Sequence, residues 1–112
     1  MKKENKPLVS VIINCHNGEK FLKDCISSII NQTYSNLELI FWDNKSEDNS
    51  AKIIKEFEDK RIKYFYSKKK TVLYFARNLA IQKAKGKFVA FLDVDDFWDH
   101  RKLSLQIPKF KD

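Results

Sequence analysis

The chain has 112 residues, the length of a single domain with one modest core. Hydrophobic residues make up 43% of it and charged residues 33%, with only two glycines and two prolines, which excludes a collagen-like, linker-like or strongly disordered chain. The 22 Lys and Arg residues exceed the 15 Asp and Glu residues by seven. This charge favours anionic partners such as nucleotides, although scattered lysines are also typical of a solvated surface.

The two cysteines and the length of the apolar runs indicate the cellular compartment in which the protein is expected. Cys15 and Cys25 are too few for a disulfide framework or a zinc site, and the pattern suits a reducing cytoplasm. No apolar run is longer than Phe88 to Leu92, which is too short for a transmembrane helix or a signal-peptide core. We therefore expect a cytoplasmic protein whose membrane contact, where it has one, is peripheral.

Apolar runs of strand length alternate with helical patterns. Val9 to Ile13 is a nearly continuous, β-branched run that is typical of a strand buried on both faces. Glu19 to Gln32 carries apolar residues three and four positions apart, as one face of a helix does. Leu37 to Trp42 predicts a second strand, and the polar stretch Asp43 to Ser50 can cap a second helix. Ile62 to Tyr66 predicts a third strand.

The remaining pattern predicts two more helices and a fourth strand. Val72 to Lys85 reads as a third helix, with Gly86 expected as its left-handed C-cap. Phe88 to Leu92 is the fourth strand, and Asp99 can cap a last helix that Pro108 should stop. The residues expected on the inner face of the third helix are Val72, Ala76, Leu79, Ala80 and Ala84.

This alternation predicts an α/β fold, Rossmann-like, with an open, mostly parallel sheet, right-handed crossovers and helices on both faces. In such sheets ligands bind outside the carboxyl ends of the strands. The polar residues gather at those ends, in the segments 14–18, 43–46, 67–71 and 93–98. We therefore expect the functional site at this edge.

Three aspartates, Asp93, Asp95 and Asp96, follow the fourth strand. At a spacing of about 6 Å their repulsion amounts to roughly 1–3 kcal/mol with an effective dielectric constant near 20–40, so a neutralising cation would explain the cluster. Carboxylate oxygens select Mg²⁺ or Mn²⁺, which typically bind one or two carboxylates together with substrate phosphate oxygens. The alternative is an acidic turn that only caps the next helix, which explains Asp99 but not the three acids before it.

Six short segments carry the most specific signal. They are Val9 to Gly18, Gln32 to Tyr34, Trp42 to Ser50, Ala76 to Asn78, Lys85 to Lys87 and Phe91 to Trp98. In order and spacing they resemble the successive motifs of the family 2 glycosyltransferases, from about Val9 to Leu103. The resemblance implies the GT-A fold, a nucleoside-diphosphate sugar donor with a UDP-sugar as first candidate, a divalent metal, and inversion at the anomeric carbon.

The resemblance also implies roles for single residues. Asn14, His16 and Asn17 match the end of the first strand, which contacts the nucleotide, and His16 stands where the family often has Tyr. Asp43 and Asn44 match an acidic pair of which one member reads the base edge. Because the amide of Asn44 both donates and accepts hydrogen bonds, a preference for uracil is less firmly implied than with two acids.

Four further residues match the family's phosphate, ribose and metal positions. Arg77 matches an arginine near the nucleotide, and its planar guanidinium suits a phosphate. Asp93 resembles a ribose-contacting acid, and Asp95 with Asp96 resembles the acids on the metal side. Simpler interpretations are an exposed helix charge for Arg77 and a solvated loop residue for His16.

No residue is assigned as a catalytic base, because in the family that group and the acceptor site lie in the half after the acidic motif. We interpret residues 1–112 as the sugar-nucleotide-binding part of a catalytic domain, truncated after this motif, that acts on a glycan or a lipid-linked acceptor. The alternative is a non-catalytic nucleotide-binding module that needs a partner for activity. Assembly into a homo-oligomer is left open.

Other functions fit less well. A dinucleotide-dependent oxidoreductase or a P-loop enzyme needs a glycine-rich loop after the first strand, where only Gly18 occurs. Nucleic-acid binding is supported only by the net charge and by Lys68 to Lys70, without a motif. We expect no nucleic-acid partner.

Overall fold

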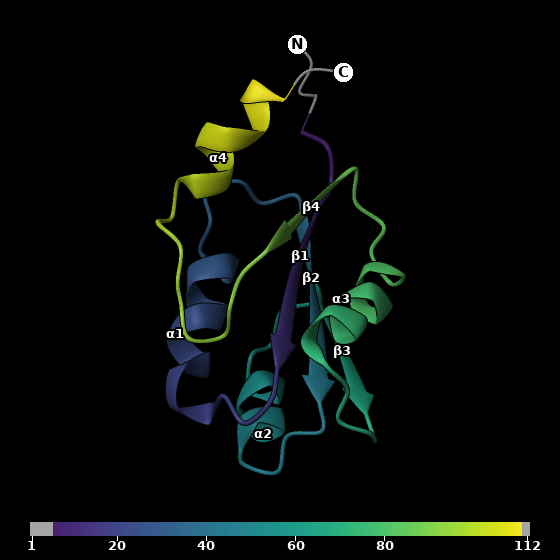
Figure 1. The fold of residues 1–112 in the computed structure, drawn as a ribbon. Coiled ribbons are helices and arrows are strands. Elements are labelled where there is room, and N and C mark those ends of the chain that lie inside the picture. Colours follow the sequence, from purple (N-terminus) through teal and green to yellow (C-terminus); the bar gives the residue numbers. More distant parts are fainter. Residues whose placement is uncertain (1–5, 111–112) are drawn as a thin grey trace.

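The computed structural model describes residues 6–110, which form a four-stranded parallel sheet in the order β3-β2-β1-β4 (Figure 1). The predicted α/β class is therefore confirmed. The elements are β1 (Val9–Cys15), α1 (Glu19–Ile30), β2 (Leu37–Asn44), α2 (Ser50–Lys55), β3 (Ile62–Ser67), α3 (Leu73–Ile81), β4 (Phe88–Phe91), α4 (Lys102–Gln106) and a 3-10 turn (Ile107–Lys109).

The sheet separates two apolar cores. Alternate residues of β1 and β2 pack against α1, α2 and α4 on one face, and the others pack against α3 on the second face. Ile12 and Ile40, which are partners in the β1–β2 register, meet Ala76 and Ala80 of α3. Because both faces of these two strands are covered, their sequences read as continuous apolar runs rather than as an alternation.

The larger core contains Cys25, which α1 places against the sheet. Its side chain is fully buried, and burial raises the pKa of the thiol to about 12. Such a thiol stays protonated and acts as a small apolar residue. None of the described helices is long and apolar enough to cross a bilayer.

The third helix is shorter than predicted. It ends at Ile81 rather than at Lys85, and Val72 precedes it with an exposed side chain instead of facing the core. The backbone amides of Lys83 and Ala84 bond three residues back, so the chain tightens and leaves the helix on its way to β4. Of the residues predicted on the inner face, Ala76, Leu79, Ala80 and Ala84 pack in the core on this side of the sheet, and only Val72 does not.

Gly86 is not a left-handed cap, because neither glycine has a positive φ. Its role is close approach: a Cβ on Gly86 would lie 2.6 Å from the backbone nitrogen of Ser10 and 2.8 Å from the carbonyl oxygen of Leu8. Its N–H donates to Ser10 Oγ (2.8 Å), and that hydroxyl donates to the buried carboxylate of Glu38 (2.6 Å). Lys85 N–H donates to the same carboxylate (2.7 Å). The turn before β4 is thus held against the backbone of β1.

We expect Gly86→Ala to lower the free energy of unfolding by about 1–3 kcal/mol, because the new methyl meets backbone atoms that cannot move without disturbing β1. Gly18→Ala is the matched control, since the nearest atoms there belong to the side chains of Val94 (2.8 Å) and Cys15 (3.0 Å), which can shift. Urea denaturation of both variants measures the difference. An equal or smaller loss for Gly86→Ala would contradict this account.

Candidate functional site

The loops that follow β1 and β2 are joined at the carboxyl edge of the sheet. His16 Nδ1 donates to the carbonyl oxygen of Asn44 (2.8 Å). The backbone N–H of Asn17 donates to Ser46 Oγ (2.9 Å), and Asn17 Oδ1 accepts from the N–H of Glu47 (2.7 Å). Asn17 holds this position with φ of 55°, a conformation that asparagine tolerates well. The two loops therefore form one hydrogen-bonded unit.

Asp43 lies beneath this unit and is fully buried. Its Oδ1 accepts from the backbone N–H of Ser46 (2.8 Å), and its Oδ2 accepts from the hydroxyl of Tyr64 on β3 (2.6 Å). Burial, followed by this hydrogen bond to a carboxylate, raises the pKa of Tyr64 above its ordinary value. Asp43 thus orders the loop after β2 from within.

Asn44 connects the same edge to the segment that leads into α3. Its Nδ2 donates to the carbonyl oxygen of Thr71 (2.8 Å), and its Oδ1 accepts from the backbone N–H of Thr71 (3.0 Å). Both halves of the amide are therefore engaged within the protein. From the sequence, Thr71 is marked only as the end of the polar segment 67–71 after the third strand, and its bonds to Asn44 are not evident there.

Asn14 offers an unused polar group on the α3 face of the sheet. It is the register partner of Trp42 on the neighbouring strand. The Oδ1 atom of Asn14 and the Nε1 atom of Trp42 are buried, and neither has a hydrogen-bond partner among residues 6–110. Buried polar atoms without partners are rare and call for a water or a ligand. An acceptor and a donor are thus left unpaired beneath the surface at this point of the sheet.

Arg77 links α3 to the end of β4. One guanidinium nitrogen, Nη2, lies 3.7 Å from Asp93 Oδ1, and the guanidinium lies 5.3 Å from the centre of the Phe91 ring. The side chains of Arg77 and Asp93 are 40% and 73% exposed, so this ion pair is weak and can be rearranged by a ligand. The guanidinium therefore remains accessible to an anion.

The predicted metal-side acids, Asp95 and Asp96, are exposed in the turn after β4. The N–H of Asp96 donates to the carbonyl oxygen of Asp93 (3.0 Å), which closes the turn. Val94 packs so close to Gly18 that the turn is held against the loop after β1. The acids are thus fixed beside the loops described above.

The carboxylates of the acidic turn suit a metal ion that takes its other ligands from water and from a substrate. Within residues 6–110, no three His, Cys, Asp or Glu side chains form a metal site by themselves. Two adjacent exposed carboxylates are nevertheless a normal protein contribution for Mg²⁺ or Mn²⁺, which keep waters and take phosphate oxygens from a substrate. Asp95 and Asp96 fit such an ion.

Gln32 has a structural role that the motif Gln32 to Tyr34 does not indicate. Its Nε2 donates to the carbonyl oxygen of Asp99 (2.7 Å), and its Oε1 accepts from the N–H of Leu103 (3.0 Å). The side chain is buried. Gln32 therefore ties the segment after the acidic turn to the end of α1.

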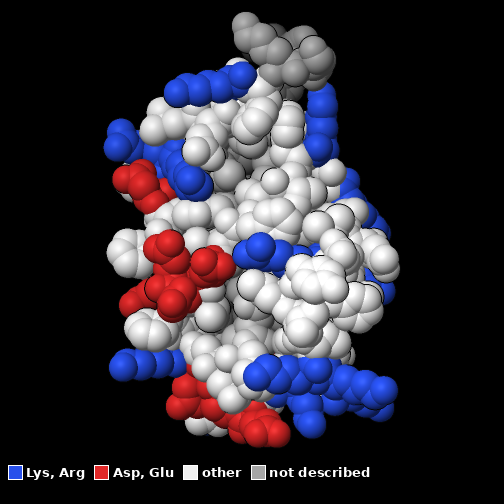
Figure 2. Space-filling view, viewed as in Figure 1, with Lys and Arg blue, Asp and Glu red and all other residues white. Residues whose placement is uncertain are grey.

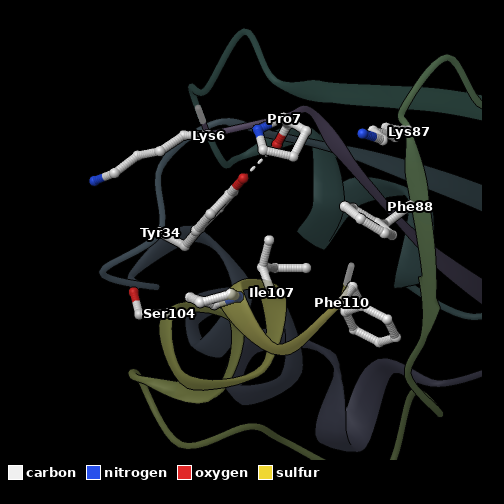
Figure 3. A pocket seen from close by; sticks show the side chains of 9 residues that line it. Lys6, Pro7, Tyr34, Lys87, Phe88, Ser104, Ile107 and Phe110 are labelled. Carbon is white, nitrogen blue, oxygen red and sulfur yellow. Dashed lines mark hydrogen bonds between the residues drawn. The ribbon is translucent and has the colours of Figure 1, made fainter. Parts of the chain in front are cut away.

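A pocket of about 780 Å³ lies at the opposite edge of the sheet (Figure 3). Its wall includes Pro7 before β1, Phe88 at the start of β4, and Tyr34. The hydroxyl of Tyr34 donates to the carbonyl oxygen of Pro7. None of the predicted site residues lines it. In a parallel sheet the carboxyl edge is the place for a ligand, so we assign the site there and not to this pocket.

The arrangement of sheet and helices is that of the GT-A glycosyltransferases. TarS from S. aureus (1–349), solved in complex with UDP, superimposes with a TM-score of 0.84 and 26% identity, covering 89% of this chain and 31% of that one. The mannosyltransferase PcManGT from Pyrobaculum calidifontis, solved with GDP-Man and Mn²⁺, shares the fold with a TM-score of 0.80 and 23% identity.

The chain belongs to glycosyl transferase family 2, whose model matches residues 10–112. The UDP-Glc:alpha-D-GlcNAc-diphosphoundecaprenol beta-1,3-glucosyltransferase WfgD of Escherichia coli is 43% identical over 100 residues, which are 89% of this chain and 40% of that protein. The putative teichuronic acid biosynthesis glycosyltransferase TuaG of Bacillus subtilis is 38% identical over 104 residues, 91% of this chain and 41% of that protein. The chain thus spans about 40% of the length of these relatives.

Proposed function

We propose that this chain is the donor-binding part of a glycosyltransferase that uses a UDP-sugar with Mg²⁺ or Mn²⁺ and transfers the sugar, with inversion, to a glycan or a lipid-linked acceptor. The observation that carries the proposal is the convergence of an unpartnered buried acceptor, an accessible guanidinium and three exposed carboxylates at one edge of the sheet. UDP in the TarS complex and the UDP-glucose and undecaprenol-linked substrate in the name of WfgD support the choice of ligands.

In this proposal the nucleoside lies against the loops after β1 and β2. Asn14 Oδ1 accepts from a ribose hydroxyl or from the ring N–H of uracil. The His16 ring, whose Nδ1 donates to a carbonyl and whose Nε2 accepts from Asn17 Nδ2 (3.4 Å), presents its face to the base. Asp43 and Asn44 act beneath the base by holding the surrounding loops in place, through Ser46 and Thr71.

The diphosphate lies between α3 and the acidic turn. Arg77 pairs with a phosphate, and Asp93, once released from Arg77, accepts from a ribose hydroxyl. Asp95 and Asp96 would hold the metal, which would supply positive charge to offset the charge on the departing diphosphate. No residue of this chain is proposed as the base that activates the acceptor hydroxyl.

Thermal melts with UDP, GDP and dTDP, each with and without Mn²⁺, test the proposal. A ligand at a hundred times its dissociation constant stabilises the fold by about 2.7 kcal/mol. For a domain of this size that corresponds to a rise in Tm on the order of 10 °C. We expect the rise with UDP and Mn²⁺ together, and little with uridine and Mn²⁺, which lacks the phosphates. No rise with any of the three diphosphates, in a sample shown by circular dichroism to be folded, would refute the proposal.

A further inference from the structure

Four consecutive large apolar side chains are exposed where α3 begins. Val72, Leu73, Tyr74 and Phe75 are 61%, 55%, 72% and 47% exposed. Successive helical residues are about 100° apart around the axis, so four in a row cannot all face the sheet. The face of α3 that is fully buried is made by Ala76 and Ala80. Large apolar residues exposed side by side mark an interaction surface rather than chance exposure.

The surroundings of these residues are basic. Lys68, Lys69 and Lys70 precede them directly, and all three are exposed. From Lys60 to Leu92, a range that holds β3, α3 and β4, the sequence has ten Lys and Arg residues and no acid. On the face shown in Figure 2 the acidic side chains lie on the left and at the foot. On the right side, where Figure 1 places β3 and α3, the charged side chains in view are all Lys or Arg.

We propose that the segment Tyr66 to Phe75 contacts an anionic membrane surface. Its lysines would pair with lipid phosphates while the apolar side chains of the first turn of α3 enter the headgroup region, which is how basic, partly apolar segments bind bilayers without crossing them. A two-fold contact between copies through this surface would instead bring two lysine clusters together and would be opposed by their repulsion. The charge therefore favours an anionic lipid surface as the occupant.

Membrane contact by the segment Tyr66 to Phe75 would have a functional consequence, because this segment lies next to the candidate nucleotide site. Thr71, between the lysines and the apolar residues, is held by Asn44 at the carboxyl edge of the sheet, beside the candidate nucleotide site. Membrane contact at this point would bring the site to the level of the headgroups, where the sugar of a lipid-linked acceptor lies. This consequence rests on the proposed function, whereas the contact itself rests on the exposed apolar and basic side chains.

Co-sedimentation of the purified protein with vesicles tests the inference. We expect binding to vesicles of phosphatidylcholine and phosphatidylglycerol in equal parts, and none to phosphatidylcholine alone. Binding should weaken steeply between 0.1 M and 1 M salt, because the screening length falls from about 10 Å to about 3 Å. Each lysine close to an anionic leaflet strengthens binding about fivefold, so changing Lys68, Lys69 and Lys70 together to Gln should lower the partition coefficient about 100-fold.

Two further variants separate the causes. Replacing Lys20, Lys23 and Lys52 by Gln makes the same change of charge on α1 and α2, on the other face of the sheet, and should leave most of the binding. Tyr74→Ser keeps the charge and removes an exposed ring, and it should weaken binding to the mixed vesicles. Equal loss in both lysine variants, or binding unchanged by both the Lys68–Lys70 variant and Tyr74→Ser, would overturn the inference.

A melt with UDP and Mn²⁺ on the same samples, without vesicles, keeps the two proposals apart. Vesicle binding without a nucleotide response would count against the proposed function alone. A nucleotide response without vesicle binding would count against the membrane contact alone. Self-association in sedimentation velocity that Tyr74→Ser abolishes would assign the surface to a second copy of the chain and overturn the choice of lipid.

Discussion

Replacing Asp43 by alanine is expected to lower the free energy of unfolding by about 3 kcal/mol. The carboxylate is fully buried and accepts hydrogen bonds from the backbone N–H of Ser46 and the hydroxyl of Tyr64. A buried donor that loses its partner costs about 1–3 kcal/mol, and here two donors lose theirs at once. Urea denaturation followed by circular dichroism measures the loss.

Two milder variants test the cause of that loss. Tyr64→Phe removes one donor together with its bond and should cost only about 1 kcal/mol. Asp43→Asn keeps an oxygen for Ser46 and offers an amide to the Tyr64 oxygen, so its cost should lie between those of the other two variants. If Asp43→Ala loses no more stability than Tyr64→Phe, the loop after β2 does not depend on this carboxylate.

The double variant Asp95→Asn/Asp96→Asn is expected to change UDP binding in opposite directions with and without metal. With Mn²⁺, the apparent affinity should fall on the order of 100-fold, the upper end of the losses seen when groups around a metal site are changed. Without metal it should rise slightly, because two negative charges no longer face the diphosphate. The stability of the ligand-free protein should be unchanged or slightly greater. Isothermal titration with UDP, with Mn²⁺ or with a chelator, measures both effects.

The control for this pair is Glu56→Gln/Glu58→Gln, which removes two exposed negative charges after α2. It should leave the metal dependence of UDP binding intact. If the ligand-free Asp95→Asn/Asp96→Asn protein unfolds, these acids are structural caps of the turn and our assignment is wrong. If it folds and still binds UDP with the original affinity and the original dependence on Mn²⁺, the metal lies elsewhere.

The order and type of the elements could be predicted from the sequence, because both depend on local patterns. The continuous β-branched run from Val9 to Ile13 indicates a strand covered on both faces, and such a strand requires helices on both sides. The spacing of Leu22, Cys25, Ile26 and Ile29 indicates one buried helix face, and these four residues are buried. The ordered motifs also indicated the family, which its model confirms.

The partners of single polar residues could not be predicted in this way. The sequence places Asn44 at the carboxyl edge but does not indicate that Thr71, 27 residues away, takes both halves of its amide. The sequence predicts Gly86 as a helix cap, because glycine follows many helices. The position requires glycine for another reason, which is that the backbone of Ser10, 76 residues away, leaves no room for a Cβ. Asn14 was placed at the site by its motif, but its unpartnered oxygen became evident only once its neighbours were packed around it.

The sequence by itself determined the class of fold, the family and the edge of the sheet that carries the polar loops. Hydrophobic periodicity and strand ends are properties of neighbouring residues, which the chain order contains. Only the tertiary structure decided which polar groups are already bonded within the protein, which are left without a partner among the described residues, and that Val72 to Phe75 are exposed. Those outcomes depend on close contacts between distant segments, and an element buries only as much of its apolar surface as the sheet beside it can cover.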